Sequence, residues 1–436
     1  MSIRTIVKKF IPKRFFKTIE PFGHLLEAIL FNSMYLFPAR KFKVIGVTGT
    51  NGKTSTAFMI YKMLLEADYK VGLMTTVAYG AGKEIKPQIH HMTNVTVPDL
   101  MKRLKWMKHK NIEWLILETT SQALAQNRVW GVPYSIAVMT NVTHEHLDYH
   151  VTFERYRDAK RKLFRLTDKN HRGLRAGIVN AEDPSADSFV KDVSYPLTYG
   201  ITKGDVRATD VKLLPDSLNY EVKLGEETLH IDCKLPGSFN VYNSLAAVCV
   251  GKTLGLSAKQ IEQGIAALES VEGRMTRINE GQAFNVVVDY AHTPDSFEKL
   301  FKDMRPVIKG KMIVMFGSPG RRDEKKRAVQ GELAGKYADE VILTEEDDRD
   351  IDGQEILDQI ATGAESMGKV RGKDLFLVHD RTKAIAFSIG RAKHSEDTVL
   401  LLGKGHEKTI ESANGENPWD EIGTAHQSLK DYLKSS

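Results

Sequence analysis

Cysteine is scarce in this chain: its 436 residues include only Cys233 and Cys249, which match no metal-ligand spacing. So few unpatterned cysteines exclude a disulfide framework and a cysteine-based metal centre, and they indicate a reducing compartment. We therefore expect a cytoplasmic protein that is stabilised by its hydrophobic core. Apolar residues make up 42% of the chain and charged residues 27%, fractions typical of a globular protein.

An excess of positive charge is also missing beyond the first 43 residues. The formal net charge is +6, but residues 1–43 contain nine Lys or Arg and two acidic residues, so the rest of the chain is close to neutral. A general basic surface for nucleic acid is therefore excluded.

No apolar run is long enough to predict a transmembrane helix. Residues 24–36 form an apolar segment that is short, is interrupted by Glu27 and is followed by no small-residue cleavage site. Residues 4–17 before it interleave basic residues with Phe10, Phe15 and Phe16. Two interpretations of residues 1–40 stay open: a helix lying on an anionic membrane surface, or a helix packed on the adjacent domain.

Three glycines stand in residues 44–55, which read VIGVTGTNGKTS. The stretch predicts a buried strand, a glycine-rich turn and the start of a helix, an arrangement that directs backbone N–H groups at an anion. Val47 stands where the general phosphate-loop pattern has its first glycine, so the alternative is an ordinary strand–helix turn. We expect Lys53 to reach nucleotide phosphates and the Thr54 hydroxyl to bind magnesium. The predicted nucleotide ligands are Thr50, Asn51, Gly52, Lys53, Thr54 and Ser55.

From residue 43 onward, predicted strands and helices alternate, as in a parallel sheet with crossover helices. Residues 80–96 are expected to be an irregular surface stretch, and residues 205–235 antiparallel hairpins inserted in the first domain. We predict the α/β class, with a basic apolar tail followed by two domains. The expected parts are the tail (1–42), a P-loop-type domain with a parallel sheet (43–272) and a Rossmann-like C-terminal domain (273–436).

Polar residues follow the predicted strands of the first domain. Glu118 ends an apolar strand at the edge where α/β sheets bind ligands, and its carboxylate is suited to a nucleotide's magnesium ion. Residues 140–150 follow another strand and are rich in metal-ligating residues: His144, Glu145, His146, Asp148 and His150. A transition-metal site is one interpretation. We favour a single histidine that serves the magnesium site, because the segment follows a strand near Glu118.

Four polar loops follow predicted strands of the second domain. They are residues 288–295, 316–323, 344–349 and 403–407. Because the carboxyl ends of parallel strands lie at one edge of a sheet, four such loops predict a ligand cleft.

Together these motifs resemble the Mur ligase family, and within it the UDP-N-acetylmuramyl-tripeptide synthetases, from about Val44 to the C-terminus. Residues 48–54 are similar to the family's phosphate loop, and ETTSQALAQNR (118–128) to its segment E-x-S-S-x-x-L-x-x-x-R. Residues 140–150 are similar to T-N-L-x-x-D-H-L-D-Y-H, with Glu145 in place of Asp. GRM (273–275), DYAHTPD (289–295) and GKGHE (403–407) are nearly identical to family motifs.

The resemblance implies an ATP-dependent ligase. A substrate carboxylate is phosphorylated, an amine attacks the acyl phosphate, and phosphate leaves as the amide forms; the protein neutralises charge and positions the reactants. The implied catalytic residues are Lys53, Glu118, His146 and Lys160. One magnesium ion is implied at Thr54 and Glu118, and a second at His146 and a carbamylated Lys160. Further ATP contacts are implied for Asn240, Arg274, Asp289 and His292.

The resemblance also implies the substrates. A UDP-muramyl peptide is the implied acceptor, bound by Thr96, Ser121, Gln126 and Arg128. In diaminopimelate-adding members the motif D-N-P-R selects the amino acid, and residues 346–349 read EDDR here. The retained Arg349 favours meso-diaminopimelate, whose second carboxylate L-lysine lacks, while the extra acids leave L-lysine open. The implied amino-acid contacts are Arg322, Glu346, Asp347, Asp348, Arg349, Gly403 and Glu407.

The beginning of the chain departs from the family pattern. Family members carry an N-terminal uridine-binding domain of about a hundred residues, a usual domain size, whereas 42 residues precede the first strand here. Thr96-Val-Pro98 also stands in place of T-T-P. We therefore hypothesise an acceptor that is membrane-associated or lacks UDP, and we expect a monomer. The alternatives are a folylpolyglutamate- or cyanophycin-type ligase and a catalytically silent, membrane-bound relative.

Overall fold

The computed structural model describes residues 13–88, 93–143, 145, 147–214 and 217–435, in two compact units. Unit 1 comprises Met1–Asp210, Tyr220–Ile231 and Val241–Ala267. Unit 2 comprises Val211–Asn219, Asp232–Asn240 and Leu268–Ser436.

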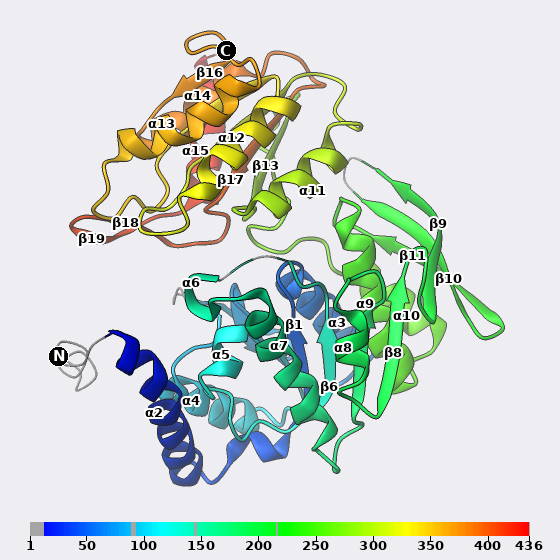
Figure 1. Cartoon of the computed structure of the whole chain (residues 1–436). Helices are drawn as coiled ribbons and strands as arrows, with labels where there is room; N and C mark the ends of the chain where they lie inside the picture. Colours follow the sequence, from blue (N-terminus) through cyan, green and yellow to red (C-terminus); the bar gives the residue numbers. More distant parts are fainter. Residues whose placement is uncertain (1–12, 89–92, 144, 146, 215–216, 436) are drawn as a thin grey trace. The chain divides into compact units, whose positions relative to one another are not determined.

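Unit 1 is built on an eleven-stranded sheet with the order β11-β10-β9-β8-β7-β6-β1-β5-β2-β3-β4 (Figure 1). Its strands are β1 (Lys43–Thr48), β2 (Val71–Met74), β3 (Ala78–Ala81), β4 (Glu84–Pro87), β5 (Trp114–Glu118), β6 (Tyr134–Met139), β7 (Ala176–Asn180), β8 (Tyr195–Gly200), β9 (Val206–Leu213), β10 (Leu218–Leu224) and β11 (Glu227–Cys233). Its helices are α2 (Lys13–Met34), η1 (Pro38–Lys41), α3 (Lys53–Glu66), α4 (Val97–His109), α5 (Ser121–Ala125), α6 (Leu147–His150), α7 (Phe153–Asp168), α8 (Ala186–Val190), α9 (Phe239–Leu254) and α10 (Ala258–Ala266).

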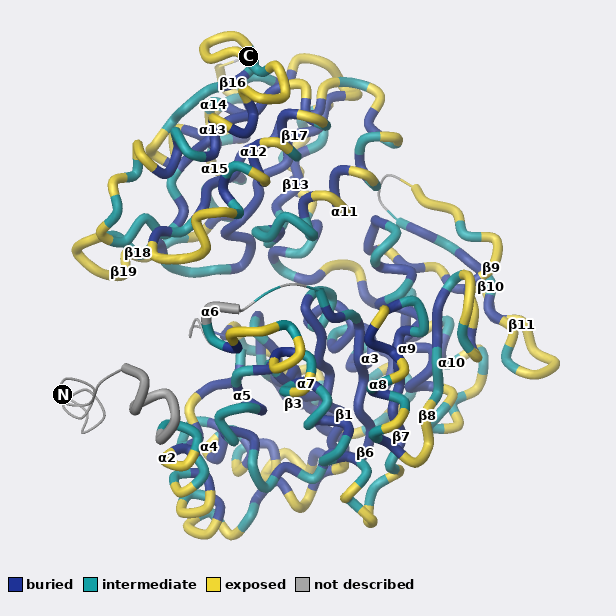
Figure 2. Tube along the Cα trace, viewed as in Figure 1, coloured by how far each residue is buried: buried dark blue, intermediate teal, exposed yellow. Residues whose placement is uncertain are grey.

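The central strands of this sheet are parallel and buried. β1 pairs in parallel with both β5 and β6, and every residue of β5, β6 and β7 is buried (Figure 2). Helix α3 packs on β1, β2 and β5, and α7 packs on β1, β6 and β7. Parallel strands covered by helices read as continuous apolar runs, which is why their sequences predicted them well.

One prediction about this sheet was wrong. Residues 80–96 do not begin as an irregular stretch, because β3 and β4 form an antiparallel hairpin that extends the sheet. The residues of β4 are exposed or only partly buried, so this edge strand carries no apolar pattern to predict it. The strands predicted within residues 205–235 are present, and β9 to β11 continue the same sheet beyond β8.

Helix α2 packs against α4 in unit 1. Ala28 and Asn32 are fully buried, and the Asn32 side-chain amide donates to the carbonyls of Ala28 (2.8 Å) and Trp130 (3.1 Å). The interpretation that this segment packs on the adjacent domain is therefore confirmed. Among the described helices, none is both long enough and apolar enough to cross a bilayer.

Unit 2 has a six-stranded sheet with the order β12-β13-β17-β14-β15-β16. One core packs α11, α12 and α13 on it, and a second core packs α14 and α15. Along β14, Val314 belongs to the first core and Ile313 and Met315 to the second, so the helices cover both faces, as predicted for a Rossmann-like domain. Its elements are β12 (Thr276–Ile278), β13 (Asn285–Asp289), α11 (Pro294–Met304), β14 (Met312–Phe316), α12 (Lys325–Tyr337), β15 (Glu340–Leu343), α13 (Gly353–Ser366), β16 (Leu375–Leu377), α14 (Arg381–Arg391), β17 (Thr398–Leu402), β18 (Thr409–Ser412), β19 (Gly415–Pro418) and α15 (Glu421–Ser435).

A fully buried ion pair joins α14 to α15. Arg381 donates to Glu421 through Nε (2.8 Å) and Nη2 (2.7 Å), and both side chains are inaccessible to solvent. Replacing Glu421 by glutamine leaves a buried guanidinium without its counter-charge, which costs about 3–5 kcal/mol. We expect Glu421→Gln to lower the melting temperature by roughly 6–20 °C, measured by calorimetry. The matched control is Glu365→Gln, whose exposed pair with Arg371 contributes less than about 1 kcal/mol; equal effects of the two changes would contradict the prediction.

Candidate active site

The glycine turn between β1 and α3 is fixed from the end of β6. Asn141 accepts from the backbone N–H of Thr50 through its carbonyl (2.8 Å) and from that of Asn51 through its side chain (2.9 Å). The Thr140 hydroxyl and the Asn141 amide both donate to the Asn51 carbonyl, at 2.6 and 3.0 Å. The loop is thus tied to the end of β6, and the backbone N–H groups of Thr50 and Asn51 are directed at Asn141.

Gly52 leads the loop into α3 with a positive φ of 82°. A Cβ atom at this position would lie 2.2 Å from the Asn243 Oδ1 atom. The close approach leaves a turn that only glycine fills, as expected of a backbone cradle for phosphates. The helix begins directly afterwards with Lys53, whose Nζ atom donates to the Thr50 carbonyl (2.8 Å).

We expect Gly52→Ala to weaken ATP binding at least about tenfold, since strain at positive φ costs about 1–2 kcal/mol and the added methyl group displaces Asn243. Titration calorimetry with ATP measures the change. The control is Gly82→Ala, which also has a positive φ (58°) but no atom within 4 Å of the added methyl group. Equal ATP affinity of Gly52→Ala and the unchanged protein would contradict the prediction.

Glu118 lies at the end of β5 and is almost fully buried. Its Oε2 atom accepts from the Thr54 hydroxyl (3.0 Å) and from the Thr76 backbone N–H (3.0 Å), and its Oε1 atom accepts from the Thr76 hydroxyl (3.1 Å). A carboxylate and a threonine hydroxyl side by side at a phosphate loop suit magnesium, which prefers oxygen ligands. Thr76 was not predicted, although its place just after the predicted strand β2 was a usable signal.

Lys160 projects from α7 to the same loop. Its buried Nζ atom donates to the Gly49 carbonyl (2.5 Å) and lies 4.4 Å from the centroid of the Tyr156 ring. Burial, together with the charge of Lys53, holds the pKa of Lys160 well below its usual value. The predicted partner in this part of the site, His146, lies outside the described residues.

Of the predicted acceptor residues, Arg128 is linked to Glu118 through Asn94, and Ser121 is bonded to His150. Arg128 donates to the Asn94 carbonyl, and the Asn94 side-chain amide donates to the Glu118 carbonyl (2.8 Å). The Ser121 hydroxyl is bonded to the His150 Nε2 atom (3.0 Å). Asn94, which sequence reasoning missed, thus links Arg128 to the backbone carbonyl of Glu118.

The other two predicted acceptor residues have local partners. Thr96 caps α4: its hydroxyl donates to the Asp99 carboxylate (2.7 Å) and accepts from the Asp99 N–H (3.4 Å). Gln126 follows α5 and is hydrogen-bonded to the Tyr149 hydroxyl. The structure therefore gives Thr96 a capping role and does not bring it to the side chains of Ser121 or Arg128.

In unit 2 a buried lysine organises two of the predicted loops. The Lys404 Nζ atom donates to Asp347 (2.9 Å), after β15, and to Glu407 (2.5 Å), after β17. Burial alone would raise the pKa of Asp347, but the Lys404 charge holds this pKa below its usual value. Lys404 belongs to a motif that was recognised, but its role as the link between the predicted residues Asp347 and Glu407 was missed.

Arg349, the predicted amino-acid selector, already has a carboxylate partner. Its Nε atom donates to Glu411 Oε2 (2.7 Å), and its guanidinium also donates to the Gly320 carbonyl. Glu411 lies in β18, and its N–H donates to Asp347 (2.9 Å). The β18–β19 hairpin is therefore bonded to the loop of residues 346–349 through Glu411. The motifs did not predict this contact.

Three further predicted residues of unit 2, Arg274, Asp289 and His292, lie at the same sheet edge. Asp289 accepts from the N–H groups of Met275 and Ala291 (both 2.8 Å), and burial raises its pKa despite the nearby Arg274. The Arg274 guanidinium lies 4.5 Å from the Tyr290 ring centroid, and His292 Nδ1 donates to the Tyr290 carbonyl (2.7 Å).

Gly403 and Glu346 meet at the ends of β17 and β15. A Cβ atom on Gly403 would lie 2.9 Å from Glu346 Oε2, and burial raises the pKa of Glu346. That oxygen has no hydrogen-bond partner among the described residues. A buried carboxylate oxygen in this state is available to a bound ligand.

Three predicted residues have other surroundings. Asp348 accepts from the Glu346 backbone N–H (3.5 Å) and is bonded to His379 Nε2 (2.8 Å), so it adjoins the Glu346 loop. Arg322 is exposed, and the Asn240 side-chain amide donates to the Pro236 carbonyl (2.7 Å).

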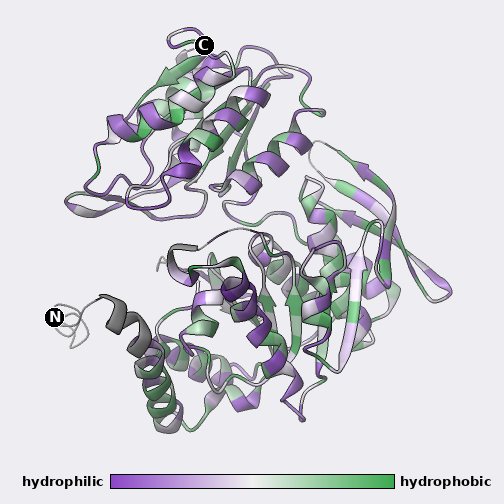
Figure 3. Cartoon of the chain, in the orientation of Figure 1, coloured by the Kyte–Doolittle hydropathy of each residue, from purple (hydrophilic) through white to green (hydrophobic). Residues whose placement is uncertain are grey.

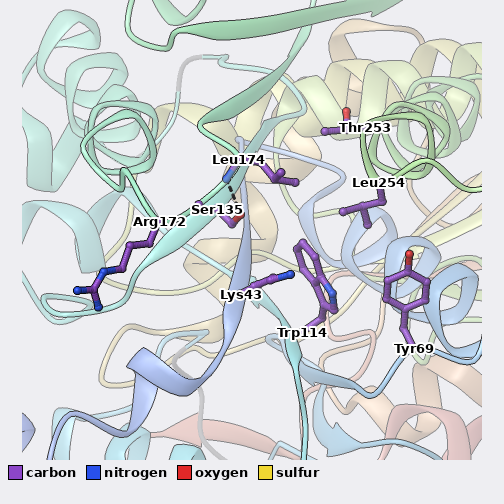
Figure 4. Close-up of a pocket in the computed structure, with 9 residues that line it drawn as sticks. Lys43, Tyr69, Trp114, Ser135, Arg172, Leu174, Thr253 and Leu254 are labelled. Carbon is purple, nitrogen blue, oxygen red and sulfur yellow. Dashed lines mark hydrogen bonds between the residues drawn. The ribbon is translucent and has the colours of Figure 1, made fainter.

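A cavity of about 330 Å³ opens at the opposite edge of the unit 1 sheet (Figure 4). It lies where β1 and β5 begin, with Lys43 Nζ 5.3 Å from the Trp114 ring centroid and the Leu174 N–H donating to the Ser135 hydroxyl (2.9 Å). None of the predicted site residues lines it.

Comparisons with known proteins agree with this geometry. Residues 47–251 match the family model of the Mur ligase middle domain, and residues 273–405 that of the Mur ligase glutamate ligase domain. A UDP-N-acetylmuramyl-tripeptide synthetase of Roseiflexus sp. is 39% identical over 424 residues, which cover 94% of this chain and 82% of that protein. A UDP-N-acetylmuramoyl-L-alanyl-D-glutamate–2,6-diaminopimelate ligase of Geobacillus thermodenitrificans is 36% identical, over 89% of this chain and 79% of that protein.

Solved structures give the same result for the fold. A UDP-N-acetylmuramoyl-L-alanyl-D-glutamate–2,6-diaminopimelate ligase superimposes with a TM-score of 0.63 and 27% identity, over 90% of this chain and 79% of the other. A folylpolyglutamate synthase of Mycobacterium tuberculosis complexed with ADP has a TM-score of 0.70 at 12% identity, over 94% of both chains; that likeness concerns the fold alone. Because a relative is 39% identical across most of both proteins and both family models match, this chain belongs to the Mur ligase family of ATP-dependent ligases.

Proposed function

We propose that the chain joins an amino acid to a UDP-N-acetylmuramyl-dipeptide-like acceptor, as in peptidoglycan precursor synthesis. The observation that carries the proposal is the Thr54–Glu118 pair (3.0 Å) beside the phosphate loop. The substrates of the related enzymes supply the substrate class. The second α/β unit, with its own cluster of charged loops, supports a ligase over a simple nucleotide hydrolase.

The residues of this site fit ATP and magnesium, which the family uses. ATP and magnesium, when bound, supply the phosphoryl group that activates the acceptor carboxylate. Lys53 would hold terminal phosphates, and Thr54 and Glu118 would hold one magnesium ion. We further propose that Lys160 is carbamylated and that, with His146, it holds a second ion. A carbamate would turn this buried amine into a carboxylate-like metal ligand.

The first candidate for the amino acid is meso-diaminopimelate. The retained Arg349 and the diaminopimelate ligases among the relatives support it. One observation favours L-lysine as a second candidate. Glu411 occupies the Arg349 guanidinium (2.7 Å), and the acids Asp347 and Glu407 nearby favour a cationic side chain over a second carboxylate.

The same proposal covers the domain boundaries, the oligomeric state and the location of the chain. We assign residues 1–42, 43–272 and 273–436 to the tail and two domains, which the two family-model ranges support. We also assign a monomeric state, a cytoplasmic location, and peripheral membrane contact through residues 1–40.

The test is phosphate release by the purified chain with ATP, magnesium and muramyl dipeptide with or without UDP. Meso-diaminopimelate and L-lysine are compared as the amine. Release that requires both acceptor and amine supports the ligase, and the faster amine identifies the amino acid. No release with any combination, although ATP binds, would overturn the proposed substrates.

A further inference from the structure

Helix α2 presents an apolar outer face. Figure 2 shows its outer side exposed, and Figure 3 shows the same helix as predominantly hydrophobic. The exposed fractions along and just after the helix are Phe22 67%, Leu26 68%, Ile29 38%, Leu30 58%, Met34 64% and Leu36 84%. We call residues 22, 26, 29, 30, 34 and 36 the α2 face.

The spacing puts these side chains on one side of the helix. Positions 22, 26, 29, 30 and 34 recur at three- and four-residue intervals, and the opposite side is the one buried against unit 1, through His24, Ala28 and Asn32. The other exposed residues of the outer side, Gly23 and Ser33, are uncharged. A helix that lies on a protein normally turns charged residues outward, so this face is adapted to an apolar environment.

Two acidic residues of α2 interact with His24. Glu27 contacts His24 Nδ1 at 3.2 Å, and Glu20 lies 3.9 Å from His24 Nε2. The Glu20 side chain is 12% exposed, whereas that of Glu27 is 37% exposed. Glu27 precedes Leu30 by three residues and Met34 by seven, so it stands at the edge of the α2 face. The face itself contains no acidic residue, and the one carboxylate at its edge contacts His24.

Cations border the α2 face. Beyond its C-terminal end, Arg40 and Lys41 are exposed, with the Arg40 guanidinium 4.0 Å from the Phe37 ring centroid. On the neighbouring α4, exposed Lys105 lies 6.0 Å from the Tyr35 ring centroid. On the other side along the sequence, residues 1–19 contain six Lys or Arg and no acid. An apolar stripe framed by cations matches the headgroup–acyl boundary of an anionic bilayer.

We propose that α2 is a membrane-docking helix, whose face of residues 22–36 enters the interface of a bilayer containing anionic lipids. This deepens the membrane contact assigned under the proposed function, and it does not depend on the reaction catalysed. A second copy of the chain fits the face less well. In the sequence, cations follow the helix at its C-terminal end and also stand before and within its first turns, so parallel and antiparallel pairing both bring like charges together.

The test is flotation of the full chain with vesicles of phosphatidylcholine alone or of phosphatidylcholine with phosphatidylglycerol. We expect binding to the anionic vesicles that weakens with salt. The double variant Leu26→Gln/Leu30→Gln should lower the partition coefficient about tenfold or more, as loss of two buried leucines predicts. Arg40→Glu/Lys41→Glu should reduce binding to anionic vesicles and leave any binding to neutral vesicles unchanged.

The matched control is Met367→Gln/Val370→Gln, which removes two exposed apolar side chains of similar exposure (45% and 52%) from unit 2; it should bind vesicles like the unchanged chain. Melting temperatures of all variants verify that they fold. Equal binding of the α2 variant and the control, or equal binding to both vesicle types, would overturn the proposal. Detection by light scattering of a dimer that the α2 variant no longer forms would also overturn the proposal. A chain that binds anionic vesicles but releases no phosphate would overturn only the proposed substrates.

Discussion

Replacing Lys160 by alanine is expected to lower kcat for amide formation by about 10³ or more. The buried amine lies at the phosphate loop, bonded to the Gly49 carbonyl (2.5 Å). Loss of a preorganised charged group at a phosphoryl-transfer site has effects of this size. The measurement is phosphate release under saturating ATP, acceptor and amine, with the melting temperature as a check on folding.

A matched control lies on the same helix. Lys162 points elsewhere, and its Nζ atom donates to Leu124 O (2.8 Å) and Asn127 Oδ1 (2.5 Å). Lys162→Ala should keep kcat within about fivefold of the unchanged chain, since it removes no charge from the loop. Comparable losses in the two variants would show that helix α7, rather than the Lys160 amine, is what the substitutions disturb.

Carbamylation makes the Lys160 prediction sharper. Carbon dioxide adds only to a neutral amine, and the lowered pKa of Lys160 keeps the amine neutral at lower pH than in an ordinary lysine. Activity should therefore fall in carbonate-free buffer, more steeply as the pH falls and the amine becomes protonated, and return with bicarbonate. In Lys160→Ala, formate or acetate should restore part of the rate by supplying the missing carboxylate. A bicarbonate-independent rate across this pH range would argue against a carbamate.

Releasing Arg349 from Glu411 is expected to change the amino-acid preference. In Glu411→Gln the guanidinium loses its charged partner (2.7 Å) and becomes able to bind a second substrate carboxylate. One charge-assisted pair contributes about 1.5–3 kcal/mol. We therefore expect the ratio of kcat/KM for meso-diaminopimelate to kcat/KM for L-lysine to rise about 10- to 100-fold. Steady-state kinetics with both amines measures it.

Two further variants make this result specific. Arg349→Ala should remove the gain when combined with Glu411→Gln, because the effect acts through the guanidinium. Glu416→Gln removes the same charge from the opposite strand of the hairpin and should leave the ratio unchanged. If Glu416→Gln raises the ratio as much, the net charge of the hairpin rather than the Arg349 contact sets the preference.

The sequence predicted most of the fold because its signals are local. The apolar runs of β5 and β6 and the glycine turn that follows β1 can be recognised within a dozen residues, so the strands and their loops were placed well. The β3–β4 hairpin was missed because β4 is an edge strand with little buried surface, and its residues show no alternation to detect.

The contacts within the site were harder to predict, because they join distant parts of the chain. Glu118 and Thr76 are 42 residues apart, and Arg349 and Glu411 are 62 apart. Motifs identified Glu118 and Arg349 singly, but which atoms each one contacts depends on how the strands are ordered in the sheet. Only the folded chain shows that Arg349 has a partner.

Lys404 and Arg349 partly neutralise the carboxylates in the loops of unit 2. Two cations, Lys404 and Arg349, are shared among three carboxylates, those of Asp347, Glu407 and Glu411. The cluster thus keeps one negative charge in excess. An incoming molecule with one positive charge more than negative completes the balance, whereas a molecule with matched charges leaves the excess in place. Under the proposed function, the net charge of the amino acid would therefore matter as well as its shape, and the Glu411 carboxylate in β18 would be the deciding charge.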